Sequence, residues 1–67
     1  MKAGEIYNIR VKDQLVSGMF IREVKSWFST RYEFQVDTHI RDFDYNREYD
    51  TKRIYAVKES EIINKMG

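Results

Sequence analysis

Oxygen-bearing side chains occupy alternate positions near the middle of this chain, in the run Asp42-x-Asp44-x-Asn46-x-Glu48. Oxygen ligands at alternate positions begin the loop with which an EF-hand wraps calcium. The run then departs from such a loop, because Arg47 occupies the place of the turn glycine and Arg53 that of the closing glutamate. We therefore predict a solvated loop whose carboxylates pair with Arg47, Lys52 and Arg53, and we expect no metal and no other cofactor.

The single histidine, His39, lies between Asp37 and Arg41, two residues from each. On a strand these three side chains share one face, so an Asp–His pair suited to general acid–base catalysis is conceivable. No serine, cysteine or glycine-rich elbow is placed to complete such a site. We predict an exposed histidine, no catalytic residue, no small-molecule substrate and no enzymatic activity.

Aromatic and basic residues interleave between residues 27 and 55. They are Trp27, Phe28, Arg31, Tyr45, Arg47, Tyr49, Lys52, Arg53 and Tyr55. Tryptophan, tyrosine and arginine are the residues most enriched at the hot spots of protein interfaces. The same mixture can stack on the bases of single-stranded nucleic acid and hold its phosphates.

The carboxylates near the tyrosines favour a protein partner over nucleic acid. The residues Asp42, Asp44, Glu48 and Asp50 surround the tyrosines and repel phosphate. A protein partner tolerates mixed charge, so we predict protein binding through Tyr45, Arg47 and Tyr49, with Trp27 and Phe28 second. The alternative is nucleic-acid binding through Arg47, Lys52, Arg53, Tyr45 and Tyr49.

The element that must position these residues is a long strand over residues 31–41. Its apolar and β-branched residues alternate with polar ones, which is typical of a strand with one buried and one wet face. The expected buried face carries Tyr32, Phe34, Val36, Thr38 and Ile40, and the expected wet face carries Glu33, Gln35, Asp37, His39 and the two arginines. Eleven extended residues span about 35 Å, so the loops before and after this strand cannot form one patch in a straight sheet.

Further strands are expected on both sides of it. Residues 5–12, 19–25 and 54–57 have strand character, with turn chemistry between Lys12 and Gly18 and with Gly18 available for a bend. Residues 25–30 and 42–50 are expected to be loops; Trp27 and Phe28 in the first either cover the core or form a binding surface. Near the end, Ser60 could cap one helical turn before a short closing strand.

The segments 4–11, 18–24 and 54–57, together with Glu61 and Ile62, resemble the strand order of small SH3-like barrels of the KOW and Tudor types. The resemblance covers most of the chain through its hydrophobic spacing. It implies a non-catalytic adaptor that binds protein or nucleic acid through its loops and one face of the barrel. Curling the sheet also hides its apolar face and its edges. We therefore predict an all-β fold, a small antiparallel SH3-like barrel of four to five strands.

Length and composition bound the remaining possibilities. The 67 residues predict a single domain, 1–67, and the absence of cysteine means that a core rich in aromatic residues must stabilise it alone. Twelve basic and eleven acidic residues give a formal charge of +1, too little for a global attraction to nucleic acid or membranes. With no apolar run of membrane-spanning length, we expect a cytoplasmic accessory or inhibitory factor of bacterial or phage origin.

Overall fold

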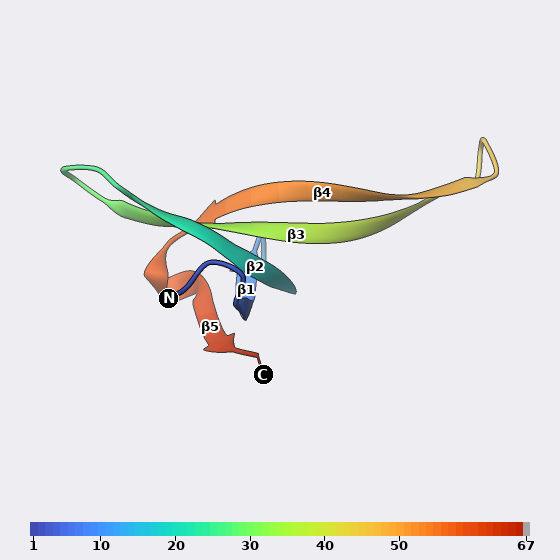
Figure 1. Ribbon diagram of the computed structural model, residues 1–67. Helices are drawn as coiled ribbons and strands as arrows, with labels where there is room; N and C mark the ends of the chain where they lie inside the picture. Colours follow the sequence, from blue (N-terminus) through green and yellow to red (C-terminus); the bar gives the residue numbers. More distant parts are fainter. Residues whose placement is uncertain (67) are drawn as a thin grey trace.

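Five antiparallel strands and one short 3-10 turn make up the fold in a computed structural model, which describes residues 1–66 (Figure 1). The strands are β1 (Ile6–Val11), β2 (Gln14–Lys25), β3 (Thr30–Asp42), β4 (Arg47–Val57) and β5 (Ile62–Lys65), and the 3-10 turn η1 (Glu59–Glu61) precedes β5. All five belong to one sheet, in the order β4-β3-β2-β1-β5. The all-β prediction is confirmed.

The connection between β1 and β2 is shorter than the sequence led us to expect. Val11 is paired with Gln14, so the turn consists of Lys12 and Asp13 alone, both with positive φ (49° and 65°). Two residues of positive φ make a turn whose twist matches that of the flanking strands. The predicted connection reaching Gly18 is therefore wrong, because β2 begins at Gln14.

Strand β2 pairs with two neighbouring strands and bends between them. Its first half pairs with β1 and its second half with β3, and Met19 is paired on both sides, with Ile6 and with Gln35. Gly18 lies at this bend, where an added Cβ would be 3.0 Å from the Cβ of Phe34. The predicted role of Gly18 in a bend thus has a steric basis, since the buried strand passes too closely for a side chain.

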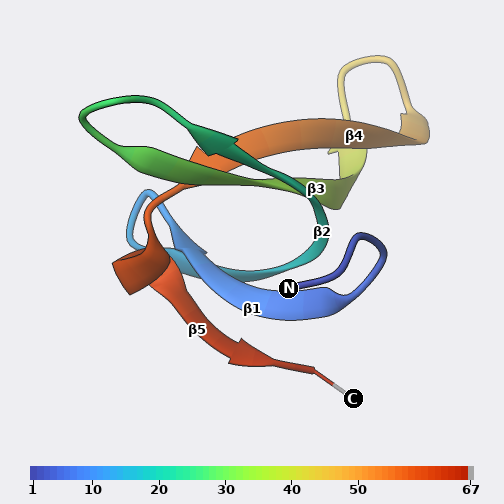
Figure 2. The ribbon, with the colours of Figure 1, turned by 60° about the vertical axis from the view of Figure 1, so that its left-hand side comes forward.

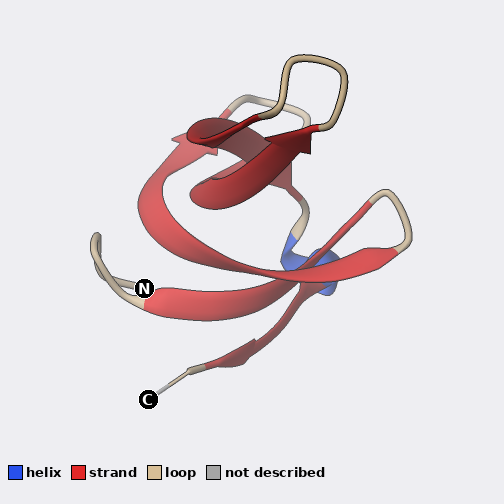
Figure 3. Ribbon diagram, turned by 90° about the vertical axis from the view of Figure 1, so that its right-hand side faces the viewer, coloured by secondary structure: helices blue, strands red, loops and turns tan. Residues whose placement is uncertain are grey.

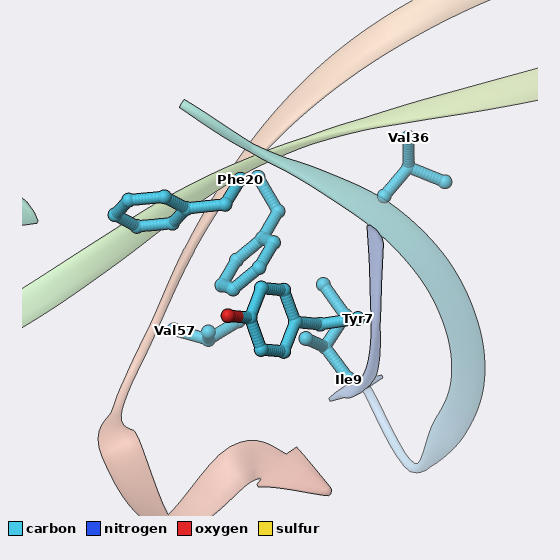
Figure 4. Close-up of a cluster of buried hydrophobic side chains, with 6 residues drawn as sticks. Tyr7, Ile9, Phe20, Val36 and Val57 are labelled. Atoms are coloured by element: carbon cyan, nitrogen blue, oxygen red, sulfur yellow. The ribbon is translucent and has the colours of Figure 1, made fainter. Parts of the chain in front are cut away.

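The core is small and largely aromatic (Figure 4). Its buried members are Tyr7, Ile9, Phe20, Phe34, Val36 and Val57. Phe34, which is fully buried, meets the rings of Tyr7 and Phe20 edge to face, with centroids 5.8 and 5.5 Å apart. Such edge-to-face packing stabilises the core beyond the area that it buries.

The alternation along β3 predicts its two faces correctly. Phe34 and Val36 are buried and Ile40 is half-buried, whereas His39 and Arg41 on the other face are exposed. The β3 strand extends one residue further at each end than the predicted 31–41.

The predicted closed barrel is wrong, because the sheet remains open. Strands β4 and β5 form its two ends and are not paired with each other over residues 1–66 (Figure 2). The sheet curls around the core, as Figure 3 shows, but the far halves of β3 and β4 continue straight past it. Besides the charged pair Asp42 and Arg47, their inner side carries two threonines, an isoleucine and a tyrosine, too little apolar surface to draw them over the core.

Strand β4 begins seven residues earlier than the predicted strand at 54–57. It pairs with β3 without interruption from Arg47, opposite Asp42, to Val57, opposite Tyr32. Only residues 43–46 remain as a loop, so the predicted loop over 42–50 is wrong. Residues 47–53 contain neither glycine nor proline, so nothing interrupts a strand there. Pairing with the long strand β3 keeps them extended although most of them are charged.

The chain ends with a single turn followed by a short strand, as predicted, but the N-cap residue of the turn is Lys58, and Ser60 lies inside it. Strand β5 pairs with β1, and the ammonium of Lys65 forms an ion pair with Glu5. Glu5 also accepts a hydrogen bond from the backbone N–H of Lys2 (2.7 Å). The bond from Lys65, then that from Lys2, lowers the pKa of Glu5 to about 2. None of the helical structure in residues 1–66 is long and apolar enough to cross a membrane.

Candidate binding surface

A two-stranded arm projects from the sheet, and we define it as residues 36–53. It contains the pairs from Val36–Arg53 to Asp42–Arg47, and the pairing of β3 with β2 ends before it, at Gln35. Figure 1 shows the arm reaching far to one side of the rest of the molecule, and the longest dimension of the fold with the arm included is 46 Å. A two-stranded ribbon with no core behind it is marginally stable in water. This arm is therefore the part of the fold that gains most from a partner.

The two faces of the arm differ in charge. The inner face, which continues the buried face of the core, carries Val36, Thr38, Ile40 and Asp42 from β3 and Arg47, Tyr49, Thr51 and Arg53 from β4. The outer face carries Asp37, His39 and Arg41 opposite Lys52, Asp50 and Glu48. Strand alternation thus turns Glu48 and Asp50 away from Tyr49, because neighbouring side chains point to opposite faces.

Three of the predicted binding residues meet at the end of the arm. The guanidinium carbon of Arg47 lies 5.4 Å from the ring centroid of Tyr45 and 5.6 Å from that of Tyr49. Both distances are those of cation–π contacts. Tyr45 is 75% exposed and Tyr49 44%, so the cluster is open to a partner. We call these three residues the Tyr-Arg-Tyr cluster.

The acidic run forms the turn between β3 and β4. The Asp42 carboxylate accepts backbone hydrogen bonds from Asp44 (3.1 Å) and Tyr45 (3.3 Å), and Asn46 adopts positive φ (50°). Both features are common in tight turns. No group of three or more acidic, histidine or cysteine side chains that could hold a metal occurs in the described part of the chain.

His39 lies in an ion-pair ladder on the outer face. Its Nδ1 is 2.9 Å from Asp50 and its Nε2 is 3.5 Å from Glu48, which in turn forms an ion pair with Arg41 at 2.7 Å. The predicted pairing of loop carboxylates with basic residues is found for Asp42, which is 3.8 Å from Arg47. The neighbour Asp37, expected beside His39, is opposite Lys52 in the register.

A pocket of about 290 Å³ opens where the inner face meets the core. It is lined by Val11, Lys12, Gln14, Val16, Val36, Thr38, Arg53 and Tyr55. Sequence reasoning missed this pocket, since it forms between the β1–β2 turn and the arm, which are distant along the chain. Its two basic residues, Lys12 and Arg53, continue the positive charge of Arg47 along the inner face.

The remaining predicted residues lie apart from the Tyr-Arg-Tyr cluster. Trp27 and Phe28 stack edge to face (5.1 Å) in the loop between β2 and β3, at the other end of β3 (Figure 1). They are 94% and 72% exposed, which resolves the choice between core and surface in favour of the surface. Lys52 and Arg53 lie on opposite faces of the arm, so the predicted nucleic-acid set is divided.

Comparison of the chain with protein-family models, with curated proteins and with solved structures finds no match.

Proposed function

We propose that this chain is a non-catalytic binding module that recognises a protein partner through the inner face of its arm. The observation that carries the proposal is the Tyr-Arg-Tyr cluster, in which one guanidinium lies over two exposed rings. Interface hot spots are enriched in these residue types. Because the cation–π contacts already order the three side chains, binding loses less conformational freedom than it would with mobile ones.

The unsupported arm is the second argument for a macromolecular partner. A partner lying along the inner face would cover Ile40 and Tyr49 and give the ribbon the apolar backing that it lacks. The pocket beside Arg53 would take a side chain of that partner. We further propose that the fold is an open relative of SH3-like barrels, supported by the strand order and by the 3-10 turn between β4 and β5.

The proposal is tested by affinity capture from a lysate of the source cells, followed by titration of the captured protein. A Tyr45→Ala, Tyr49→Ala variant is expected to lose the partner or to bind it at least tenfold more weakly. A Leu15→Ala, Ile63→Ala variant is the matched control, because it removes two exposed apolar side chains outside the arm. Equal binding by all three proteins would refute the arm as the site.

A Trp27→Ala, Phe28→Ala variant tests the second predicted surface. These two side chains form a separate exposed pair, and we expect them to contribute less than the Tyr-Arg-Tyr cluster. Complete loss of the partner in this variant, with full binding by the tyrosine variant, would place the site at the opposite end of β3.

Single-stranded nucleic acid is the second candidate partner, favoured by the division of charge between the two faces. Arg47 and Arg53 share the inner face with Tyr49 and with a single strand carboxylate, that of Asp42, while Glu48 and Asp50 point away from it. Bases could then stack on the tyrosines and phosphates could contact the arginines. Fluorescence polarisation with single-stranded and duplex oligonucleotides at low and at physiological salt tests this. Binding that weakens steeply with salt is the expected result, and no binding at low salt would exclude it.

A further inference from the structure

The free edge of β4 is unusually open for a sheet edge. Strand β4 is at one end of the sheet and has eleven residues, whereas β5 at the other end has four. Its pairing with β3 has no bulge, and the chain contains no proline. Short strands, bulges, prolines and charged side chains are the usual means by which proteins prevent a sheet edge from pairing with another chain. This edge has none of the first three, and its five charged residues are of both signs, so they can pair as well as repel.

Charges along β4 are arranged so that the strand complements itself. If a second copy pairs antiparallel with Thr51 opposite the partner's Thr51, then Asp50 faces the partner's Lys52. In the same register Tyr49 faces the partner's Arg53. Opposite charges, an aromatic ring with a cation, and two threonines are each favourable as directly opposed pairs. By symmetry, the first two pairs occur twice.

Neighbouring registers are unfavourable. The two copies are related by a two-fold axis perpendicular to the sheet, so each residue lies opposite a residue whose side chain points to the same face. Side chains alternate between the faces, and the register can therefore shift only by two residues at a time. One step places Asp50 opposite the partner's Asp50 and Arg47 opposite the partner's Arg53, and these repulsive pairs outnumber the attractive pairs of Glu48 with the partner's Lys52. The step in the other direction places Lys52 opposite the partner's Lys52. Like charges directly opposed are destabilising. The pairing centred on Thr51 is therefore selected over both neighbours.

We propose that β4 pairs with β4 of a second copy of this chain, centred on Thr51, to give a sheet continuous across two molecules. The two arms then form a four-stranded unit in place of two unsupported ribbons, which addresses their weakness as isolated hairpins. In this register Tyr49 of one arm lies beside Arg53 at the pocket of the other. The proposal goes beyond the proposed function, and of the Tyr-Arg-Tyr cluster it uses only Tyr49.

Sedimentation equilibrium with charge-reversal variants tests this pairing. The wild-type mass should rise with concentration from 8.2 kDa towards twice that value. Asp50→Lys alone, or Lys52→Glu alone, opposes like charges at two symmetric positions and should weaken the dimer roughly 30-fold. An equimolar mixture of the two variants restores both attractive pairs, as does the double variant Asp50→Lys, Lys52→Glu, and both should recover the dimer.

The recovery in the mixture also shows that each single variant is folded. A wild-type protein that stays monomeric up to millimolar concentration would overturn the proposal, and so would single variants that dimerise as well as the wild type. Since these substitutions leave Tyr45, Arg47 and Tyr49 in place, failure of the dimer would leave the protein-binding proposal standing.

Disulfide crosslinking provides a second, geometric test. The chain has no cysteine, so Thr51→Cys and Thr38→Cys each introduce a single thiol. Thr38 is opposite Thr51 in the register of β3 and β4 and thus lies one strand further from the second copy. Mild oxidation should link Thr51→Cys into a dimer and leave Thr38→Cys monomeric, since a disulfide needs Cα atoms within about 7 Å. Equal crosslinking of the two variants would overturn the register.

Discussion

Gly18→Ala should destabilise the fold because the bend in β2 leaves no room for a methyl group. The added Cβ would lie 3.0 Å from the Cβ of Phe34 and 3.3 Å from side-chain carbons of Ile9 and Val36. Phe34 and Ile9 are fully buried and cannot yield outwards. Overpacking of this kind destabilises a fold by about 1–3 kcal/mol. Replacing glycine by alanine also lowers the conformational entropy of the unfolded chain, which stabilises the fold by about 0.4–1 kcal/mol. We expect a net loss of about 1–2 kcal/mol.

Urea unfolding followed by far-UV circular dichroism measures this loss. A chain of 67 residues has a stability of about 3–10 kcal/mol, so the expected loss is a substantial fraction of the total. The midpoint should fall by about 1 M or more at unchanged slope. Ser17→Ala, at the exposed neighbouring position, is the control and should change stability by less than about 0.5 kcal/mol. Equal or higher stability of Gly18→Ala would refute the argument that β2 passes Phe34 too closely for a side chain.

Three further perturbations have defined outcomes. The pKa of Glu5 is about 2 against an ordinary 4.5, so its ion pair with Lys65 stabilises the fold above pH 4.5, and this stabilisation is lost as the pH falls towards 2. Thermal melts should show a melting temperature that falls over this pH range, and the fall should be smaller in Glu5→Gln. Trp27→Ala should change the free energy of unfolding by less than about 0.5 kcal/mol in urea titrations, and a larger loss would contradict its 94% exposure. Asp42→Ala removes the carboxylate that holds the arm's turn and should cost about 1 kcal/mol, with amide exchange fastest near Tyr45; unchanged exchange there would contradict this role.

The elements that sequence alone predicted are those governed by local pattern. Period-two alternation identified the buried face of β3 with Phe34 and Val36, because side chains on a strand point to its two sides in turn. The closing turn near Ser60 and the strand after it were also predicted. The start of β4 was missed, since its charged residues lack local strand signals and extend only by pairing with β3.

The candidate site was predictable in its residue types and not in its arrangement. Tyr45, Arg47 and Tyr49 stand out by composition, but the contact of one guanidinium with two rings depends on where the turn begins. In the sequence Glu48 and Asp50 are next to the tyrosines, but in the structure they lie on the outer face of the arm, opposite to the face that carries Tyr49. Which charges share a face depends on strand pairing, and that pairing follows from hydrogen bonds between segments distant in sequence.

By itself the sequence determined that this protein is an all-β domain with an aromatic core, since alternation and burial of apolar area are properties of each segment. Only the tertiary structure decided that the sheet stays open, that β3 and β4 continue into an arm, and that a pocket forms at its base. Those outcomes depend on how much apolar surface one segment offers another, a property of pairs of segments that no single stretch of sequence contains.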